Sequence, residues 1–116
     1  MSLRLKRAYA DADRDDGYRV LVDRLWPRGL SKEDAHIDAW LKALAPSGQL
    51  RKWFGHDRRK WAEFKKHYFE ELEQQQDAVR DLAARAGQGA VTLLYGARDE
   101  QHNNAAALKE YLERRM

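Results

Sequence analysis

The sequence contains no cysteine and only two prolines among its 116 residues. The lack of cysteine excludes disulfide bonds, thiolate metal sites and cysteine nucleophiles. No apolar run approaches the roughly 18 residues of a membrane-spanning helix, and the first residues lack the apolar segment of a secretory signal. We therefore expect a cytoplasmic protein that does not bind a membrane, and its length is typical of one domain over residues 1–116.

Neither sign of charge dominates, because there are 22 basic and 19 acidic side chains and the formal net charge is +3. The charges are distributed unevenly: residues 1–68 have a net charge of +6, and residues 69–116 have a net charge of −3. This asymmetry indicates an electropositive face that attracts an anion. A solvated surface of mixed charge has the same composition, so the motifs must decide between the two.

Three short segments have the composition of β-strands. Residues 2–7 alternate polar and apolar side chains, and residues 18–25 and 90–95 are apolar enough to be buried on both faces of a sheet. Pro27 and Gly29 end the second segment. The acidic stretch between the first two strands is typical of a loop, which leaves open whether these strands form a hairpin or are joined by a crossover.

Helix caps and apolar periodicity predict four helices. They cover residues 31–45, 47–54, 57–86 and a last segment that begins at Asn103 or Asn104. Strands that alternate with helices indicate an α/β domain with a small, mainly parallel sheet of three or four strands, flanked by helices. Because the connection from residues 18–25 to residues 90–95 is long and helical, these two strands should be parallel.

The long helix over residues 57–86 has one apolar stripe at helical spacing. The stripe predicts a buried face formed by Trp61, Phe64, Tyr68 and Leu72. The charged side chains expected on its outer face are Lys65, Lys66, Glu73 and Arg80.

Two arginines, Arg24 and Arg28, lie in the turn after the second strand. Ligands of open α/β sheets bind beyond the carboxyl ends of the strands, and guanidinium groups are suited to carboxylate or phosphate. The two arginines are therefore candidates for binding a small anionic ligand. In the structural alternative, Asp23 pairs with one of the arginines and Trp26 packs in the core.

The loop after the third strand should reach the same crevice. His102 is a candidate general acid or base, because imidazole titrates near neutral pH, and Asp99 is a candidate to orient it. Asn103 and Asn104 are candidate ligand-binding residues at a helix start, where backbone N–H groups favour anions. In the alternative, an asparagine only caps the helix and His102 is exposed. The four histidines match no metal-ligand spacing, so we predict no metal site. The loop after the third strand is neither a Walker loop nor a G-x-G-x-x-G fingerprint, and we predict no cofactor.

Nucleic-acid binding is the second function that the sequence allows. The segment at residues 51–66 combines cations with aromatic side chains, as single-strand-binding surfaces do. Its candidate residues are Arg51, Lys52, Trp53, Arg58, Arg59 and Lys60. A basic helix start over an aromatic core is the structural alternative, and protein interaction through an exposed tryptophan is a third function.

Four stretches of the sequence resemble the YeaO-like family of small bacterial proteins, a domain of unknown function (DUF488). They are VDRLWPRG at 22–29, APS at 45–47, LRKWFGHD at 50–57 and TLLYGARD with HNNA within 92–105. The resemblance extends from about Leu5 to Leu112 and implies no established activity. Longer relatives carry Cys-His-Arg where His102, Asn103 and Asn104 stand here, so any cysteine chemistry of those relatives cannot transfer to this chain.

Overall fold

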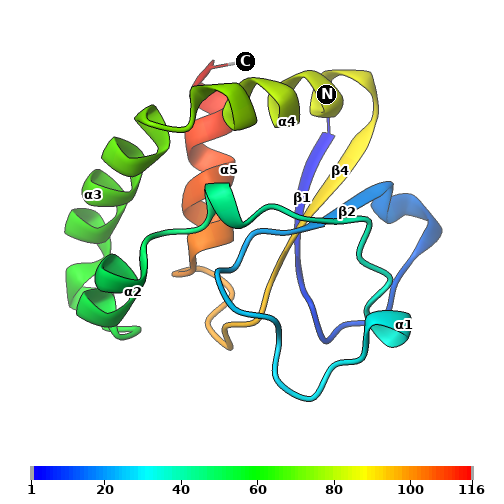
Figure 1. The fold of residues 1–116 in the computed structure, drawn as a ribbon, viewed down its shortest axis with the longest axis horizontal. Helices are drawn as coiled ribbons and strands as arrows, with labels where there is room; N and C mark the ends of the chain where they lie inside the picture. Colours follow the sequence, from blue (N-terminus) through cyan, green and yellow to red (C-terminus); the bar gives the residue numbers. More distant parts are fainter. Residues whose placement is uncertain (1, 116) are drawn as a thin grey trace.

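The computed structural model describes residues 2–115, which form an α/β fold around a four-stranded, all-parallel sheet (Figure 1). The strands lie in the order β1-β4-β2-β3. Their bounds are Ser2–Arg7 for β1, Tyr18–Leu21 for β2, Ala39–Trp40 for β3 and Ala90–Tyr95 for β4. The predicted α/β class and the parallel pairing of β2 with β4 are confirmed, although β2 is shorter than the predicted strand.

A crossover, not a hairpin, joins β1 to β2. Both strands pair in parallel with β4, which lies between them: Leu3 is opposite Val91, and Val20 is opposite Leu93. The connection contains only the short 3₁₀ turn Arg14–Asp16. The central position of β4 explains its composition, because side chains on both of its faces are buried.

Three long helices cover one face of the sheet. They are α3 (Trp61–Glu73), α4 (Gln76–Gln88) and α5 (Asn104–Arg115), and their apolar side chains form the main core with those of the strands (Figure 1). None of the helices in residues 2–115 is long and apolar enough to cross a membrane.

The opposite face is covered by the irregular segment between β2 and β3. Trp26 and Trp40 pack there against buried Leu21 and Leu94. Each indole also donates a hydrogen bond within the segment, from Trp26 to the carbonyl of Leu30 at 2.6 Å and from Trp40 to the carbonyl of Asp23 at 2.7 Å. These contacts fix the turn that follows β2, where the two candidate arginines lie.

The helix predicted over residues 31–45 is wrong. Only one turn forms, α1 (Lys32–Ala35), because His36 adopts a left-handed conformation and Ala39 enters the edge strand β3. The cause lies elsewhere in the chain: Arg19 donates hydrogen bonds to the carbonyls of Ala35 and His36 at 3.0 and 2.9 Å. In a continuous helix those carbonyls would accept from the N–H groups four residues later.

The single helix predicted over residues 57–86 is also wrong, since it is divided at Gln74 and Gln75 into α3 and α4. A straight helix of that length would extend about 45 Å at a rise of 1.5 Å per residue. The longest dimension of the fold is 35 Å. Breaking the helix lets both halves of the apolar stripe pack against the same core.

The buried and exposed faces predicted for residues 57–86 are largely confirmed in α3 and α4. Phe64, Tyr68 and Leu72 are buried, and Trp61 is partly buried against them. Lys66, Glu73 and Arg80 are exposed, whereas Lys65 is partly buried and pairs with Glu110 at 3.1 Å.

The predicted caps of the two remaining helices are confirmed. The Ser47 hydroxyl accepts the Leu50 N–H at the start of α2 (Gly48–Phe54), and Gly55 ends that helix in a left-handed conformation. Asn103 caps α5, because its side-chain oxygen accepts the Ala106 N–H at 2.8 Å. The polar candidates of the last loop are therefore held at the start of a rigid helix.

Candidate functional site

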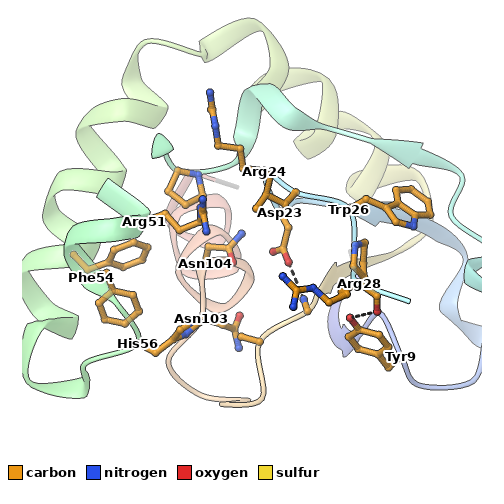
Figure 2. A pocket seen from close by; sticks show the side chains of 16 residues that line it. Tyr9, Asp23, Arg24, Trp26, Arg28, Arg51, Phe54, His56, Asn103 and Asn104 are labelled. Atoms are coloured by element: carbon orange, nitrogen blue, oxygen red, sulfur yellow. Dashed lines mark hydrogen bonds between the residues drawn. The ribbon is translucent and has the colours of Figure 1, made fainter. Parts of the chain in front are cut away.

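The turns after β2 and β4 open onto one cavity of about 470 Å³ (Figure 2). Its lining includes residues 23–28 after β2, residues 96–97 after β4, residues 103–104 at the start of α5, and Arg51 and Phe54 of α2. Carboxyl ends of parallel strands meet at one edge of a sheet, which is why segments far apart in sequence line the same space. The structure thus brings together the predicted residues Arg24, Arg28, Asn103 and Asn104.

Asp23 joins the two turns that form the cavity. Its Oδ2 accepts the Gly96 N–H at 2.8 Å, while its Oδ1 is buried without a hydrogen-bond partner among residues 2–115. A Cβ at position 96 would come within 3.3 Å of Oδ2, so glycine permits this close approach. The alternative that Asp23 forms an ion pair with Arg24 or Arg28 is wrong for the part of the chain that the structure describes.

The electrostatic environment of Asp23 is set by burial and by neighbouring cations. Burial raises the pKa of this carboxyl above its ordinary value, although the Gly96 N–H, the Asn104 amide and the charges of His56 and Arg51 lower it. The cavity therefore contains a carboxyl group whose ionisation is costly.

The two asparagines have different hydrogen bonds. Asn103 uses both ends of its amide within the fold, because Nδ2 donates to the carbonyl of Asp99 at 2.9 Å and Oδ1 caps α5. Asn104 donates from Nδ2 to the carbonyl of Val22 at 2.8 Å, which ties α5 to the end of β2. Its Oδ1 forms no hydrogen bond with residues 2–115 and remains available as an acceptor in the cavity wall.

Two guanidinium groups enter the cavity from opposite sides. Figure 2 shows Arg28 extending from the turn after β2 and Arg51 from α2, with His56 near Asn103. Arg24 lines the edge of the cavity, but its side chain points away from Arg28 toward the start of α2.

Neither Arg28 nor Arg51 forms an ion pair with any of residues 2–115. The backbone of Arg28 is held in place by Tyr9, whose hydroxyl donates to its carbonyl at 2.8 Å. The fold therefore holds the backbone of Arg28 in place, while its guanidinium group has no ion-pair partner among residues 2–115.

His102 and Asp99 lie outside the cavity lining. Nδ1 of His102 is 3.2 Å from Oδ2 of Asp99, and its ring meets Trp61 edge-on. Hydrogen bonds from the backbone N–H groups of Gln101 and His102 hold the pKa of Asp99 well below its usual range, and Arg58 pairs with it at 2.9 Å. Acid–base catalysis by His102 stays a prediction, and its ring is directed to a helix instead of the cavity.

The residues of the basic aromatic segment contact different parts of the fold. Arg51 lines the cavity, but Arg58 pairs with Asp99, Arg59 pairs with Asp57, and Lys60 donates to the carbonyl of Trp53 at 2.8 Å. Lys60 also lies over the Trp53 ring, 5.0 Å from its centroid. Lys52 is exposed, and Trp53 is 37% exposed. Much of the charge that suggested nucleic-acid binding is thus already engaged within the fold.

Sequence reasoning did not assign Asp23, Arg51 and His56 to one ligand site. Arg51 and His56 lie far from Asp23 in sequence, and Arg51 could not be distinguished from the other exposed cations of a basic stretch. One signal was available: Ser47 predicts a helix start and Gly55 its end, which places Arg51 on a short helix whose apolar face must pack on the core.

The family comparison agrees with the resemblance found in the sequence. The model of a family described as "Inactive DUF488-N3 subclade" matches residues 2–116. The chain belongs to this family. It is 42% identical over 112 residues to the uncharacterized protein YeaO of Escherichia coli K12, with 97% of each chain covered. It is 40% identical over 113 residues to the uncharacterized proteins Mb3100c of Mycobacterium bovis and Rv3073c of Mycobacterium tuberculosis, covering 97% of this chain and 95% of each relative. No solved structure gives a significant match.

Proposed function

We propose that this protein binds a small anionic ligand, such as one that bears a phosphate group, in the cavity at the carboxyl ends of β2 and β4. The observation that carries the proposal is the pair Arg28 and Arg51, which face one space from two segments without an ion-pair partner in residues 2–115. Guanidinium groups that face one space from two segments suit an anion bound between them, because each presents N–H donors to carboxylate or phosphate oxygens.

The charge balance of the lining supports the same conclusion. Three arginines line the cavity together with one carboxyl group, Asp23. Asp23 accepts the Gly96 N–H and forms no ion pair with these arginines among residues 2–115, so their charges are not balanced by direct contact with it. An anion of charge −2, which phosphate monoesters carry at neutral pH, would complement this excess of positive charge.

Binding without chemical conversion is favoured over catalysis. The one imidazole–carboxylate pair proposed for acid–base chemistry, His102 with Asp99, is turned away from the cavity. The chain has no cysteine nucleophile, and its family is described as an inactive subclade. We expect the protein to act as a cytoplasmic binding protein, with enzymatic activity as the alternative.

Nucleic-acid binding through the basic segment has less support. Arg58, Arg59 and Lys60 each contact a partner within the fold, so binding a phosphate backbone would require those contacts to be exchanged. Strong dependence of binding on salt concentration would distinguish that function, because each phosphate contact releases counterions.

A thermal unfolding assay with inorganic pyrophosphate tests the proposal. We expect saturable stabilisation of the wild type, because a ligand that binds only the folded state raises its melting temperature. Arg28→Ala should lose most of this shift. The matched control is Arg59→Ala, which removes one positive charge outside the cavity and should keep the shift.

The proposal would be contradicted if Arg28→Ala and Arg59→Ala responded alike to pyrophosphate. In a parallel assay, a single-stranded oligonucleotide that bound the wild type tightly and lost affinity in Arg59→Ala would favour the nucleic-acid function instead.

A further inference from the structure

The cavity has an apolar part as well as a cationic part. Among residues 2–115 only three large apolar side chains are exposed, and two of them, Tyr9 (42%) and Leu25 (59%), line this cavity. Phe54 and Pro46 add apolar surface elsewhere in the lining. An inorganic anion would leave this surface uncovered, so the lining favours a ligand with a flat apolar body attached to its anionic group.

Hydrogen-bond acceptors lie in the same cavity wall. Asn104 donates from Nδ2 to the carbonyl of Val22, so its amide orientation is fixed and Oδ1 is the free end. The neighbouring Asp23 carboxyl has an oxygen without a partner in the described chain. Both groups accept hydrogen bonds, and they would be satisfied by N–H groups of a ligand.

The donor on such a ligand should be neutral. An ammonium group placed beside Asp23 would be repelled by the cations of Arg24, Arg28 and Arg51, which line the same cavity. The N–H groups of a heteroaromatic ring donate hydrogen bonds without carrying positive charge, and the ring faces suit apolar and aromatic walls.

We infer that the ligand is a nucleotide. Its phosphate meets Arg28 and Arg51, and its base lies against Leu25 and Tyr9 with an N–H edge toward Asn104 and Asp23. This inference rests on the proposed function and specifies the class of anion.

Calorimetric titrations with ribose 5-phosphate and with the four nucleoside 5′-monophosphates test the inference. The sugar phosphate carries the same anion without a base. We expect at least one nucleotide to bind ten-fold or more tightly than ribose 5-phosphate. If ribose 5-phosphate binds and no nucleotide exceeds it, the inference is wrong while the proposed function stands. If none of these compounds nor pyrophosphate binds, the proposed function fails as well.

The Asp23→Asn variant tests the contact with the base separately from the contact with the phosphate. The amide keeps an acceptor for the Gly96 N–H but removes negative charge from the cavity. We expect the preference for the nucleotide over ribose 5-phosphate to fall about ten-fold, while the affinity for ribose 5-phosphate stays the same or rises. Equal weakening for both compounds would overturn the assignment of Asp23 to the base.

Leu25→Ser provides a second variant that does not depend on the buried carboxyl. Since Leu25 is 59% exposed, its replacement should leave the fold intact. We expect it to weaken nucleotide binding several-fold and to leave ribose 5-phosphate binding unchanged. An unchanged nucleotide affinity would contradict the placement of the base on this wall.

Discussion

An aspartate lies near arginine side chains at each end of β2. The aspartate at the start of the strand forms an ion pair with an arginine, whereas the aspartate at the other end forms none among residues 2–115. At the start of the strand, Asp16 and Arg19 are 3% and 4% exposed and form an ion pair with each other. Lys6 adds a second cation to Asp16 at 3.0 Å. At the other end, Asp23 accepts the Gly96 N–H, and neither Asp23 nor Arg28 has an ion-pair partner among residues 2–115.

This difference distinguishes charged side chains that stabilise the fold from charged side chains that are available to a ligand. The guanidinium group of Arg19 donates to the Asp16 carboxylate and to the carbonyls of Ala35 and His36. Such a saturated cluster fixes the fold and offers nothing to a ligand. Arg28 and Arg51 are exposed and form no ion pair among residues 2–115, so their guanidinium groups are available to an anion.

The largest effect on stability should come from Asp16→Ala. The substitution leaves the buried Arg19 cation without its partner, so we expect the free energy of unfolding to fall by about 3–5 kcal/mol. Urea denaturation monitored by tryptophan fluorescence measures the loss. A decrease below about 1 kcal/mol would show that the two ends of β2 do not differ in the way described.

The largest effect on binding should come from Arg28→Ala or Arg51→Ala. A hydrogen bond to a charged group contributes about 1.5–3 kcal/mol, so pyrophosphate affinity should fall roughly ten-fold or more in each variant. Arg24→Ala should have a smaller effect, because that side chain points away from Arg28. Calorimetric titration measures the pyrophosphate affinity of the three variants. A larger loss of affinity in Arg24→Ala than in Arg51→Ala would show that Arg24 and Arg28, the pair first indicated by the sequence, bind the anion.

Asp16 and Asp23 should make the free energy of unfolding depend on pH in opposite ways. Burial raises the pKa of Asp16, but the Asp13 N–H, Lys6 and Arg19 lower it more, so the pKa lies below the ordinary 3.8. Asp16 therefore stabilises the fold above pH 3.8, and this contribution is lost as pH falls through its folded-state pKa. Burial holds the pKa of Asp23 above 3.8, so Asp23 costs stability once pH rises through that value.

Two asparagine variants measure this contrast in denaturation curves between pH 3 and pH 7. The stability deficit of Asp16→Asn should be largest at neutral pH and shrink on acidification. Asp23→Asn should be at least as stable as the wild type at neutral pH, and the wild type should approach it as pH falls. If Asp23→Asn were instead less stable than the wild type, by an amount that grew with pH, the Asp23 carboxylate would be shown to stabilise the fold.

The smallest effect should come from Arg59→Ala. Arg59 pairs with Asp57 on an exposed turn, and exposed ion pairs contribute little because water screens them. We expect neither the denaturation midpoint nor the pyrophosphate affinity to change measurably. A clear loss of pyrophosphate affinity would mean that the basic segment, not the cavity, attracts the anion.

Local signals in the sequence predicted most of the strands and caps. The apolar composition of residues 90–95, the Ser47 cap and the Asn103 cap depend on neighbours in the chain, and each is found in the structure. Residues 31–45 were wrongly predicted as helical because the carbonyls that end α1 are bound by Arg19, which is far away in sequence.

The candidate site was predicted only in part for the same reason. Arg24, Arg28, Asn103 and Asn104 follow strands and could be placed at one sheet edge from topology alone. Arg51 reaches that edge from α2, which depends on how α2 packs. The partner of Asp23 is a backbone N–H after β4, and no side-chain pattern in the sequence encodes it.

The central claim is that the unpaired arginines in the cavity form the anion site. The most direct test compares two double variants that each lose two positive charges, Arg28→Ala/Arg51→Ala and Arg58→Ala/Arg59→Ala, by calorimetric titration with pyrophosphate at one salt concentration. Saturable binding should persist in the second variant and be at least ten-fold weaker in the first. Equal affinities in the two variants would contradict the claim.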